Sequence, residues 1–373
     1  MRVGVVGLGA VAQAVHLPLV TKRGDLFAVT ALCDLSAGLA ERVADRFGLG
    51  AASRHRSLED LLDGGRVDAV LLLTSGSHAA AAATVLGRGL PVLCEKPLAY
   101  TLADADALAA LAGRGRARLQ LGYMKLYDPA VRGALDALAA GRPVLRAVDV
   151  TVLHPSAAAQ LAHTGLVAPA DDVPAAALEM LEQETARLQE LAIGPATAEL
   201  RRLYTDVLLG SLVHELAVVR LLAGDPERIE HADAWPAGSW PPSVAVDALL
   251  PAGVRLSMRW HYLDRYPAYR EEIRLHHEEG SIALRFPSPY LLHAPTRLTV
   301  TGRAGHAARS STDRSTVEAF EEELVAFHRL VSDGTPAAAG VAEGRADILT
   351  CQRITRHLAG RRGVEVAGEA AGA

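Results

Sequence analysis

The sequence predicts an α/β protein of two domains, a doubly wound parallel sheet followed by an α/β domain whose open sheet is mostly antiparallel. The 373 residues exceed one typical domain, and the hydrophobic half of them can bury a sizeable core. Apolar runs alternate with helical patterns through residues 1–123, as in sheets built from crossover helices. From 229 to 300 strand patterns follow one another with turns between them, which favours antiparallel pairing.

The same rhythm sets the expected boundaries. We predict a first domain at 1–123, a second at 124–360 with a helical insert at about 156–205, and a flexible tail at 361–373. In the first domain we expect strands at 2–7, 27–34, 69–74, 91–94 and 119–123, and helices at 10–22, 36–47, 57–62, 77–88 and 101–112. In the second we expect strands at 144–153, 254–260, 270–276, 281–286 and 297–300, and helices at 175–191, 207–222, 317–330 and 343–358.

Composition argues against several classes of protein. The 38 Lys and Arg nearly balance the 43 Asp and Glu, so we expect neither nucleic acid nor a membrane as partner. No apolar run is long enough to span a bilayer, and residues 1–6 lead into a strand without an export signal, so we expect a cytoplasmic protein. Cys33, Cys94 and Cys351 are far apart, which indicates reduced thiols and no metal site.

A glycine-rich motif lies between the first predicted strand and the first predicted helix. Residues 7–12 read Gly-Leu-Gly-Ala-Val-Ala, the dinucleotide-binding fingerprint of Rossmann domains. Gly7 allows the tight turn, Gly9 lets the pyrophosphate approach the backbone, and Ala12 keeps the helix close to the sheet. The pyrophosphate would then meet the free N–H groups at the start of the helix.

An acidic residue completes this pattern. Asp34 ends the second predicted strand, about 20 residues after the fingerprint, where a carboxylate accepts hydrogen bonds from the adenosine ribose hydroxyls. The same carboxylate would repel a 2′-phosphate, and Leu35 and Ser36 supply no compensating arginine. We therefore expect NAD as the cofactor, in preference to NADP.

A second motif follows the predicted strand at 91–94. Glu95-Lys96-Pro97, behind a dinucleotide fingerprint, resembles the Gfo/Idh/MocA oxidoreductases, the family of glucose–fructose oxidoreductase and inositol dehydrogenase. The resemblance extends to residues 122–129, to the C-terminal residues 319–328 and to the loop 74–78, which lacks the usual proline of the family. It covers nearly the whole chain and implies a cofactor across the carboxyl ends of the parallel strands, with the substrate between the domains.

The resemblance also assigns residues. It implies that Lys96 lies beside the nicotinamide, where it either hydrogen-bonds the reacting hydroxyl or carries its proton, and that the bond to Pro97 is often cis. Tyr123 and Lys125 are expected to contact substrate, although Leu126 replaces an arginine common in the family. The expected cofactor-binding residues are Gly7, Gly9, Ala10, Val11, Ala12, Asp34, Thr74, Ser75, His78, Glu95 and Lys96.

The second catalytic element of the family is an Asp-x-x-x-His pair on an apolar helix. His214 matches the histidine, which implies that it accepts the hydroxyl proton and contacts the substrate, but Gly210 stands where the aspartate should be. Asp206 lies about two turns before His214 and could reach the site only if the helix is offset. This departure leaves three possibilities open: His214 works with Lys96 alone, the chemistry is a variant, or dehydrogenase turnover is lost.

The function we expect is hydride transfer between NAD and a secondary alcohol of a cyclic polyol, sugar or sugar derivative. One alternative is a lyase, epimerase or glycoside-cleaving enzyme that recycles its NAD. Another is a dinucleotide-binding regulatory protein without turnover, which the Gly210 substitution favours. Because the family pairs its open sheets, we also expect a homodimer or homotetramer.

Overall fold

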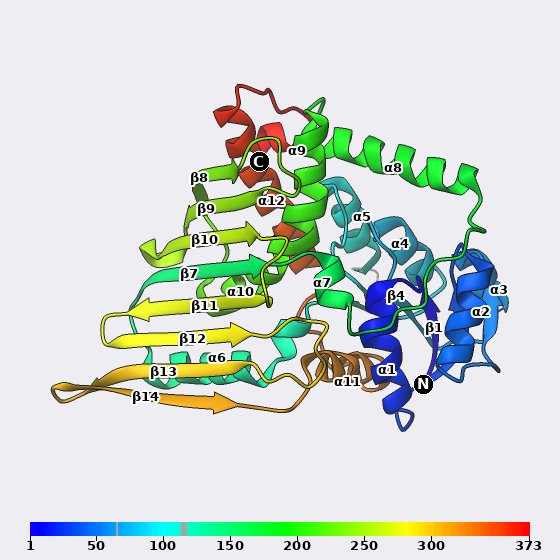
Figure 1. Cartoon of the computed structure of the whole chain (residues 1–373), viewed down its shortest axis with the longest axis horizontal. Coiled ribbons are helices and arrows are strands. Elements are labelled where there is room, and N and C mark those ends of the chain that lie inside the picture. The colour runs from blue at the N-terminus through cyan, green and yellow to red at the C-terminus, as the bar shows by residue number, and fades with distance from the viewer. Residues whose placement is uncertain (65, 113–117) are drawn as a thin grey trace. The chain divides into compact units, whose positions relative to one another are not determined.

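The computed structural model describes residues 1–64, 66–112 and 118–373 (Figure 1). It divides into two compact units. The first comprises 1–123, 163–192 and 320–348, and the second comprises 124–162, 193–319 and 349–373. The sequence assigned 163–192 and 320–348 to the second domain, but the chain returns twice to the first unit. In the second of these segments, the Ala339 carbonyl accepts a hydrogen bond from the Leu121 N–H at 3.0 Å.

The first unit contains a parallel sheet in the order β3-β2-β1-β4-β5-β6. Its strands are β1 (Arg2–Val6), β2 (Ala28–Cys33), β3 (Ser53–His55), β4 (Ala69–Leu72), β5 (Val92–Cys94) and β6 (Leu119–Leu121). Its helices are η1 (Ala12–His16), α1 (Leu17–Lys22), α2 (Ala37–Arg46), α3 (Leu58–Gly64), α4 (Ala79–Gly87) and α5 (Leu102–Ala112), with most of α8 (Ala175–Ile193) and α11 (Ala319–Ser332).

Sequence patterns explain these elements. All four residues of β4 are buried, as expected for an apolar strand with both faces covered. Ser36 caps α2, with its hydroxyl oxygen accepting a hydrogen bond from the Leu39 N–H. The helix predicted at 10–22 contains a π-helical stretch, η1, whose five residues are all buried.

The second unit contains an eight-stranded sheet in the order β14-β13-β12-β11-β7-β10-β9-β8. Neighbouring strands are antiparallel except β7 and β10. Its strands are β7 (Leu145–His154), β8 (Arg228–Trp235), β9 (Ser243–Leu249), β10 (Arg255–Tyr262), β11 (Arg270–His277), β12 (Gly280–Phe286), β13 (Arg297–Ala304) and β14 (Ala307–Arg314). The two sheets confirm the predicted fold class.

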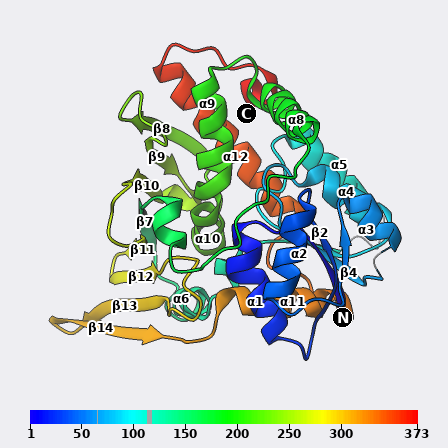
Figure 2. The same ribbon diagram turned by 45° about the vertical axis from the view of Figure 1, so that its right-hand side comes forward.

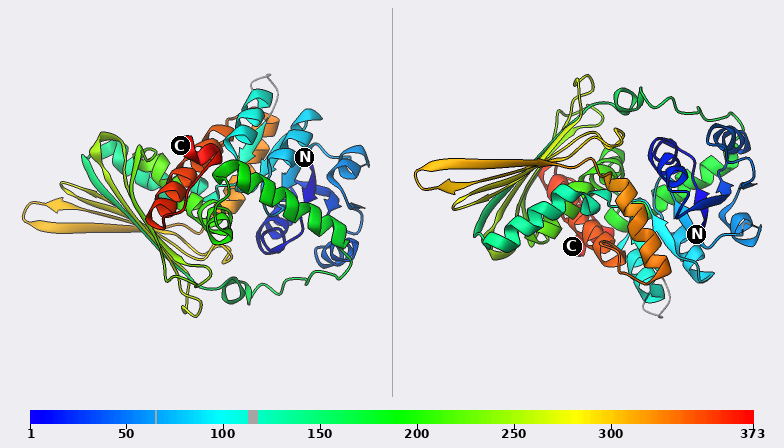
Figure 3. Two further views of the ribbon diagram at one scale, coloured as in Figure 1. Left: turned by 90° about the horizontal axis from the view of Figure 1, so that it is seen from above. Right: turned by 90° about the horizontal axis from the view of Figure 1, so that it is seen from below.

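Helices accompany this sheet. They are η2 (Met124–Tyr127), α6 (Pro129–Gly141), α7 (Ala157–Leu161), α9 (Ala198–Arg202), η3 (Leu203–Leu212), α10 (Val213–Ala223), η4 (Pro251–Gly253), the later part of α12 (Val341–Arg361) and η5 (Gly368–Gly372). Helix α6 packs against β12 and β13, and Figure 3 shows it along one face of the sheet. That face is apolar, with Val148, Val150 and Ile273 buried.

The opposite face of the sheet is polar. It carries paired charges, including Arg274 with Glu272 at 2.7 Å and Arg259 with Asp247 at 2.9 Å. The predicted flexible tail contains η5, in which Ala370 is fully buried. None of the helices in the described ranges is both long enough and apolar enough to cross a bilayer.

Candidate functional site

The fingerprint turn has the geometry that its glycines predict. Gly7 has φ of +88°, and a Cβ built on it would lie 2.7 Å from the Thr74 backbone nitrogen, so no larger residue fits. Gly9 differs, because a Cβ there would meet nothing within 4 Å. The backbone at Gly9 therefore borders open space at the start of a helix, which suits the close approach of a pyrophosphate.

Asp34 lies at the end of β2 and supports this turn. One carboxylate oxygen accepts the Leu8 N–H at 2.9 Å, and the other accepts the Ser36 N–H at 2.9 Å. A carboxylate oxygen can accept more than one hydrogen bond, so both retain capacity for ribose hydroxyls. The fingerprint and Asp34 together fit a nicotinamide dinucleotide.

The Glu95-Lys96-Pro97 segment follows β5, and its Lys96–Pro97 peptide bond is cis, as the resemblance implied. Glu95 is buried, with Oε1 2.9 Å from His16 Nε2 and Oε2 accepting the Lys96 N–H at 3.2 Å. Burial acts to raise the pKa of Glu95, but the hydrogen bond and charge of His16, with Lys96 nearby, outweigh it and lower the pKa. Glu95 is therefore held as a carboxylate behind the half-buried Lys96.

His78 joins two of the predicted cofactor loops. Its Nδ1 lies 2.7 Å from the Pro97 carbonyl and its Nε2 lies 2.9 Å from the Thr74 carbonyl. The side chain is fully buried, and this burial lowers its pKa. The imidazole thus braces the loop of Thr74 and Ser75 against the Lys96 segment, with its ring nitrogens directed at backbone oxygens.

In the second unit, His214 lies near the start of α10, directly after the π-helical η3. A Cβ on Gly210 would lie 3.1 Å from the Thr205 carbonyl, so this turn leaves little room for a side chain. Asp206 is half exposed and pairs with Arg202 at 3.6 Å, while its Oδ1 accepts the Thr205 hydroxyl at 2.8 Å. Asp206 therefore forms a surface ion pair with the last residue of the preceding helix, α9.

Two residues that were predicted to contact the substrate form buried hydrogen bonds within their own units. Tyr123 is 1% exposed and donates its hydroxyl to Asp347. Lys125 is 6% exposed and donates to Glu215 at 2.9 Å and to Glu271 at 2.6 Å. Burial lowers the pKa of Lys125, but these carboxylates outweigh it and raise the pKa, so Lys125 stays charged. Their contact with substrate remains a prediction.

Comparison with known proteins identifies the first unit. Residues 1–123 match the family model described as oxidoreductase family, NAD-binding Rossmann fold. Over these residues the chain is similar to the Gfo/Idh/MocA oxidoreductases. Inositol 2-dehydrogenase 1 of Saccharopolyspora erythraea is 39% identical over 150 residues, which are 39% of this chain and 44% of that protein. The matched region thus spans less than half the length of that curated relative.

Solved structures extend the likeness in fold to both units of this chain. A scyllo-inositol dehydrogenase from Lactobacillus casei, with NAD(H) and scyllo-inositol bound, has a TM-score of 0.68 at 15% identity, covering 98% of both chains. A 3-ketoreductase from Actinomadura kijaniata, in complex with NADP, has a TM-score of 0.70 at 18% identity, also covering 98% of both chains. These identities establish a shared fold.

Sequence reasoning missed several residues that this chain gathers around the predicted ones. His16 holds the Glu95 carboxylate, with its Nε2 2.9 Å from Glu95 Oε1. In the second unit the Tyr269 hydroxyl donates to Glu271 at 2.6 Å, and the Trp260 indole donates to Ser211 at 3.0 Å, on the helical stretch that leads to His214. His16 and Glu95 lie 79 residues apart, and Trp260 and Ser211 lie 49 apart, so no local motif signals these two contacts.

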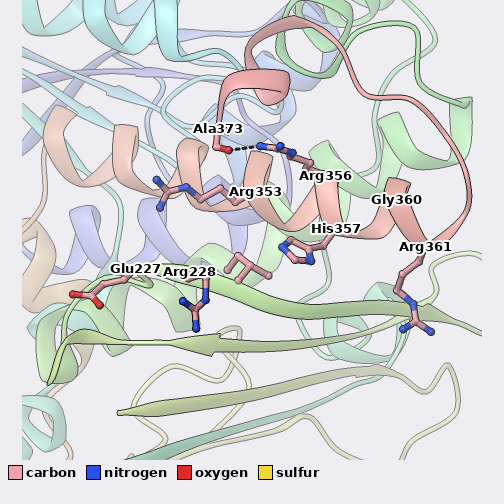
Figure 4. Close-up of a pocket in the computed structure, with 9 residues that line it drawn as sticks. Glu227, Arg228, Arg353, Arg356, His357, Gly360, Arg361 and Ala373 are labelled. Carbon is pink, nitrogen blue, oxygen red and sulfur yellow. Dashed lines mark hydrogen bonds between the residues drawn. The ribbon is translucent and has the colours of Figure 1, made fainter. Parts of the chain in front are cut away.

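One hollow is separate from the residues singled out by sequence. Figure 4 shows this hollow in the second unit, about 690 Å³ in volume, between α12 and the start of β8. Among its lining residues are Arg228, Arg353, Arg356 and His357. Arg356 donates to the Ala373 carbonyl at 2.8 Å, and Arg361 pairs with Asp233 at 3.6 Å. It contains none of the predicted cofactor or catalytic residues.

Proposed function

We propose that this chain is an NAD-dependent oxidoreductase that transfers a hydride to or from a secondary alcohol of a cyclic polyol, sugar or sugar derivative. The observation that carries the proposal is Lys96, set at the end of β5 between the anchored Glu95 carboxylate and the cis peptide bond to Pro97. The match of residues 1–123 to the oxidoreductase family model supports it, as does the likeness to an inositol 2-dehydrogenase.

The proposed chemistry divides between cofactor and protein. When bound, the nicotinamide dinucleotide supplies the hydride acceptor or donor. Lys96 hydrogen-bonds the reacting hydroxyl or holds its proton, and Glu95 fixes the backbone of Lys96 through its N–H. His214 is the proposed proton acceptor, acting without the aspartate that Gly210 replaces.

The cofactor is proposed to be NAD, because Asp34 offers its carboxylate where a 2′-phosphate would be repelled. The partners are proposed to be a small polyol or sugar and further copies of this chain in a homodimer or homotetramer. A cytoplasmic location is proposed as well.

The test is NADH absorbance with purified protein, NAD and a panel of inositols, aldonates and sugars. We expect turnover on at least one compound and its loss in Lys96→Ala. Lys22→Ala is the matched control, since Lys22 is half exposed and pairs with Glu321 on the surface. Turnover that survives Lys96→Ala would contradict the catalytic assignment.

The missing aspartate at Gly210 also leaves a variant chemistry open, and the second candidate is an enzyme that recycles its NAD in a lyase, epimerase or glycoside-cleaving reaction. Its signature is tightly held NAD and product formation without net NADH. NAD binding with neither product nor NADH on any compound would instead indicate a non-catalytic regulatory protein.

A further inference from the structure

The irregular chain before α8 lies against the dinucleotide fingerprint. We call residues 163–172 the strap; all of it belongs to the first unit, and it leads toward α8 past α1 and α2 (Figure 2). At one point it contacts η1: the Gln13 side chain accepts the Val167 N–H at 2.8 Å and donates to the Val167 carbonyl at 3.2 Å. The same Gln13 amide donates to the Leu8 carbonyl of the fingerprint at 2.9 Å.

The strap is also fastened along α2. Arg42 donates to the Ala168 carbonyl at 2.6 Å, and Arg46 donates to the Thr164 carbonyl at 2.9 Å. Near the start of α2, a Cβ on Gly38 would lie 3.1 Å from the Ala170 Cβ, so the glycine permits the close approach. The strap therefore follows α2 from its C-terminal residue Arg46 to its N-terminus, and it contacts η1 midway, at Val167.

The end of the strap places a second carboxylate beside the ribose-binding acid. Asp172 Oδ2 accepts the Gly38 N–H at 2.9 Å, and Oδ1 accepts the Ser36 hydroxyl. Ser36 is bonded in turn to Asp34 through its N–H at 2.9 Å. The carboxylate of Asp172 thus occupies the N-terminus of α2, where Ser36 links it to Asp34.

An adenosine 2′-phosphate would need these same donors. In a Rossmann site the ribose 2′-hydroxyl faces the acid at the end of the second strand, and a phosphate there requires N–H or hydroxyl donors and a cation. Ser36 and Gly38 supply a hydroxyl and an N–H at the start of α2, and both are bonded to Asp172. Arg56, the adjacent cation, donates to the carbonyls of Leu35 and Asp172 at 3.2 and 3.3 Å.

We propose that Asp172 is a specificity-determining residue that fills the 2′-phosphate position with its own carboxylate and so restricts the site to NAD. The inference rests on the proposed function, because it requires the fingerprint to take a nicotinamide dinucleotide. The preference for NAD would then depend on Asp34 and also on a carboxylate from a distant part of the chain.

The experiment measures the dissociation constants of NAD and NADP by isothermal titration calorimetry, without substrate. The variants are Asp172→Asn, which removes the charge, and Asp172→Ala, which also removes the hydrogen-bond acceptor. Asp171→Asn is the matched control, since Asp171 is an adjacent exposed aspartate on the same segment. Circular dichroism establishes that each variant is folded.

We expect the wild type and Asp171→Asn to prefer NAD strongly. In both Asp172 variants the NADP dissociation constant should fall by about tenfold or more, the scale expected for removing one charge near a phosphate. The NAD constant should change by less than about threefold in the same variants. An unchanged NADP constant, with NAD still bound, overturns this inference alone, as does an equal effect of Asp171→Asn. Failure of the wild type to bind either dinucleotide overturns the proposed function together with it.

Discussion

His16 and Glu95 meet inside the first unit, with His16 Nε2 2.9 Å from Glu95 Oε1 and both side chains almost fully buried. The pair joins the helical stretch after the fingerprint to the residue that precedes Lys96. Since Glu95 also accepts the Lys96 N–H, it links the dinucleotide turn to the proposed proton-handling residue.

This pair should be strongly coupled in stability. His16→Leu leaves Glu95 as a buried carboxylate without its partner, and breaking a buried pair in this way costs about 3–5 kcal/mol. Adding Glu95→Gln removes the uncompensated charge, so the double variant should be more stable than His16→Leu alone. Urea denaturation of the four proteins measures the coupling. Strictly additive losses would show that the pair does not act as a unit.

The buried cluster around Lys125 should respond unequally to its two carboxylates. Burial, more than any other factor, raises the pKa of Glu215, which accepts a single hydrogen bond from Lys125, whereas Glu271 accepts bonds from both Lys125 and Tyr269. Glu215→Gln should therefore cost less than about 1 kcal/mol, because the amide oxygen can still accept the Lys125 hydrogen bond while Glu271 pairs with the ammonium group. Lys125→Met should cost about 3–5 kcal/mol, because Glu271 loses its cation. Urea denaturation measures the loss in free energy of unfolding of each variant, and equal losses would refute the asymmetry.

Much of the first unit follows from local signals. The glycine spacing, the position of Asp34 and the alternation of apolar runs with helices each lie within short stretches, so they predict the parallel sheet and the fingerprint turn. The π-helical stretches at 12–16 and 203–212 were not predicted. An apolar pattern of five to ten residues does not distinguish the period of a π-helix from that of an α-helix.

The contacts that complete the site could not be predicted from the sequence. His16 and Glu95 are 79 positions apart, and Ser36 and Asp172 are 136 apart. The strap has no hydrophobic period, and its partners Arg42 and Arg46 look in sequence like the solvated face of an amphipathic helix. Such long-range polar contacts depend on the tertiary fold.

Glu323 predicts a pH dependence of stability. It is fully buried, and within the described residues neither carboxylate oxygen has a hydrogen-bond partner. Burial, followed by the negative charge of Glu95, raises its pKa well above the ordinary value. The folded protein therefore keeps a proton that the unfolded chain releases, so this contribution is fully present below about pH 4.3 and is lost as the pH rises toward the folded pKa.

Glu323→Gln should remove this loss of stability at higher pH. The free energy of unfolding of the variant relative to wild type should rise with pH between about 5 and 8, by up to about 1.4 kcal/mol per pH unit. Urea denaturation across this range measures it. Glu322→Gln, the neighbouring and more exposed glutamate, is the control and should show no such trend. A difference that stays constant with pH would mean that Glu323 is ionised in the folded protein.

Substitutions at the two fingerprint glycines should have different effects, one on stability and the other on cofactor binding. Gly7→Ala puts a Cβ 2.7 Å from the Thr74 backbone nitrogen at a φ of +88°, so it should destabilise the protein by at least about 1–3 kcal/mol. Gly9→Ala meets nothing within 4 Å, so its free energy of unfolding should stay within about 1 kcal/mol of wild type. Its Cβ would nevertheless occupy the space that the pyrophosphate needs. Calorimetric titration should therefore show NAD affinity reduced by about tenfold or more in a stable Gly9→Ala protein. Full NAD affinity in that variant would mean that the dinucleotide does not approach the backbone at Gly9.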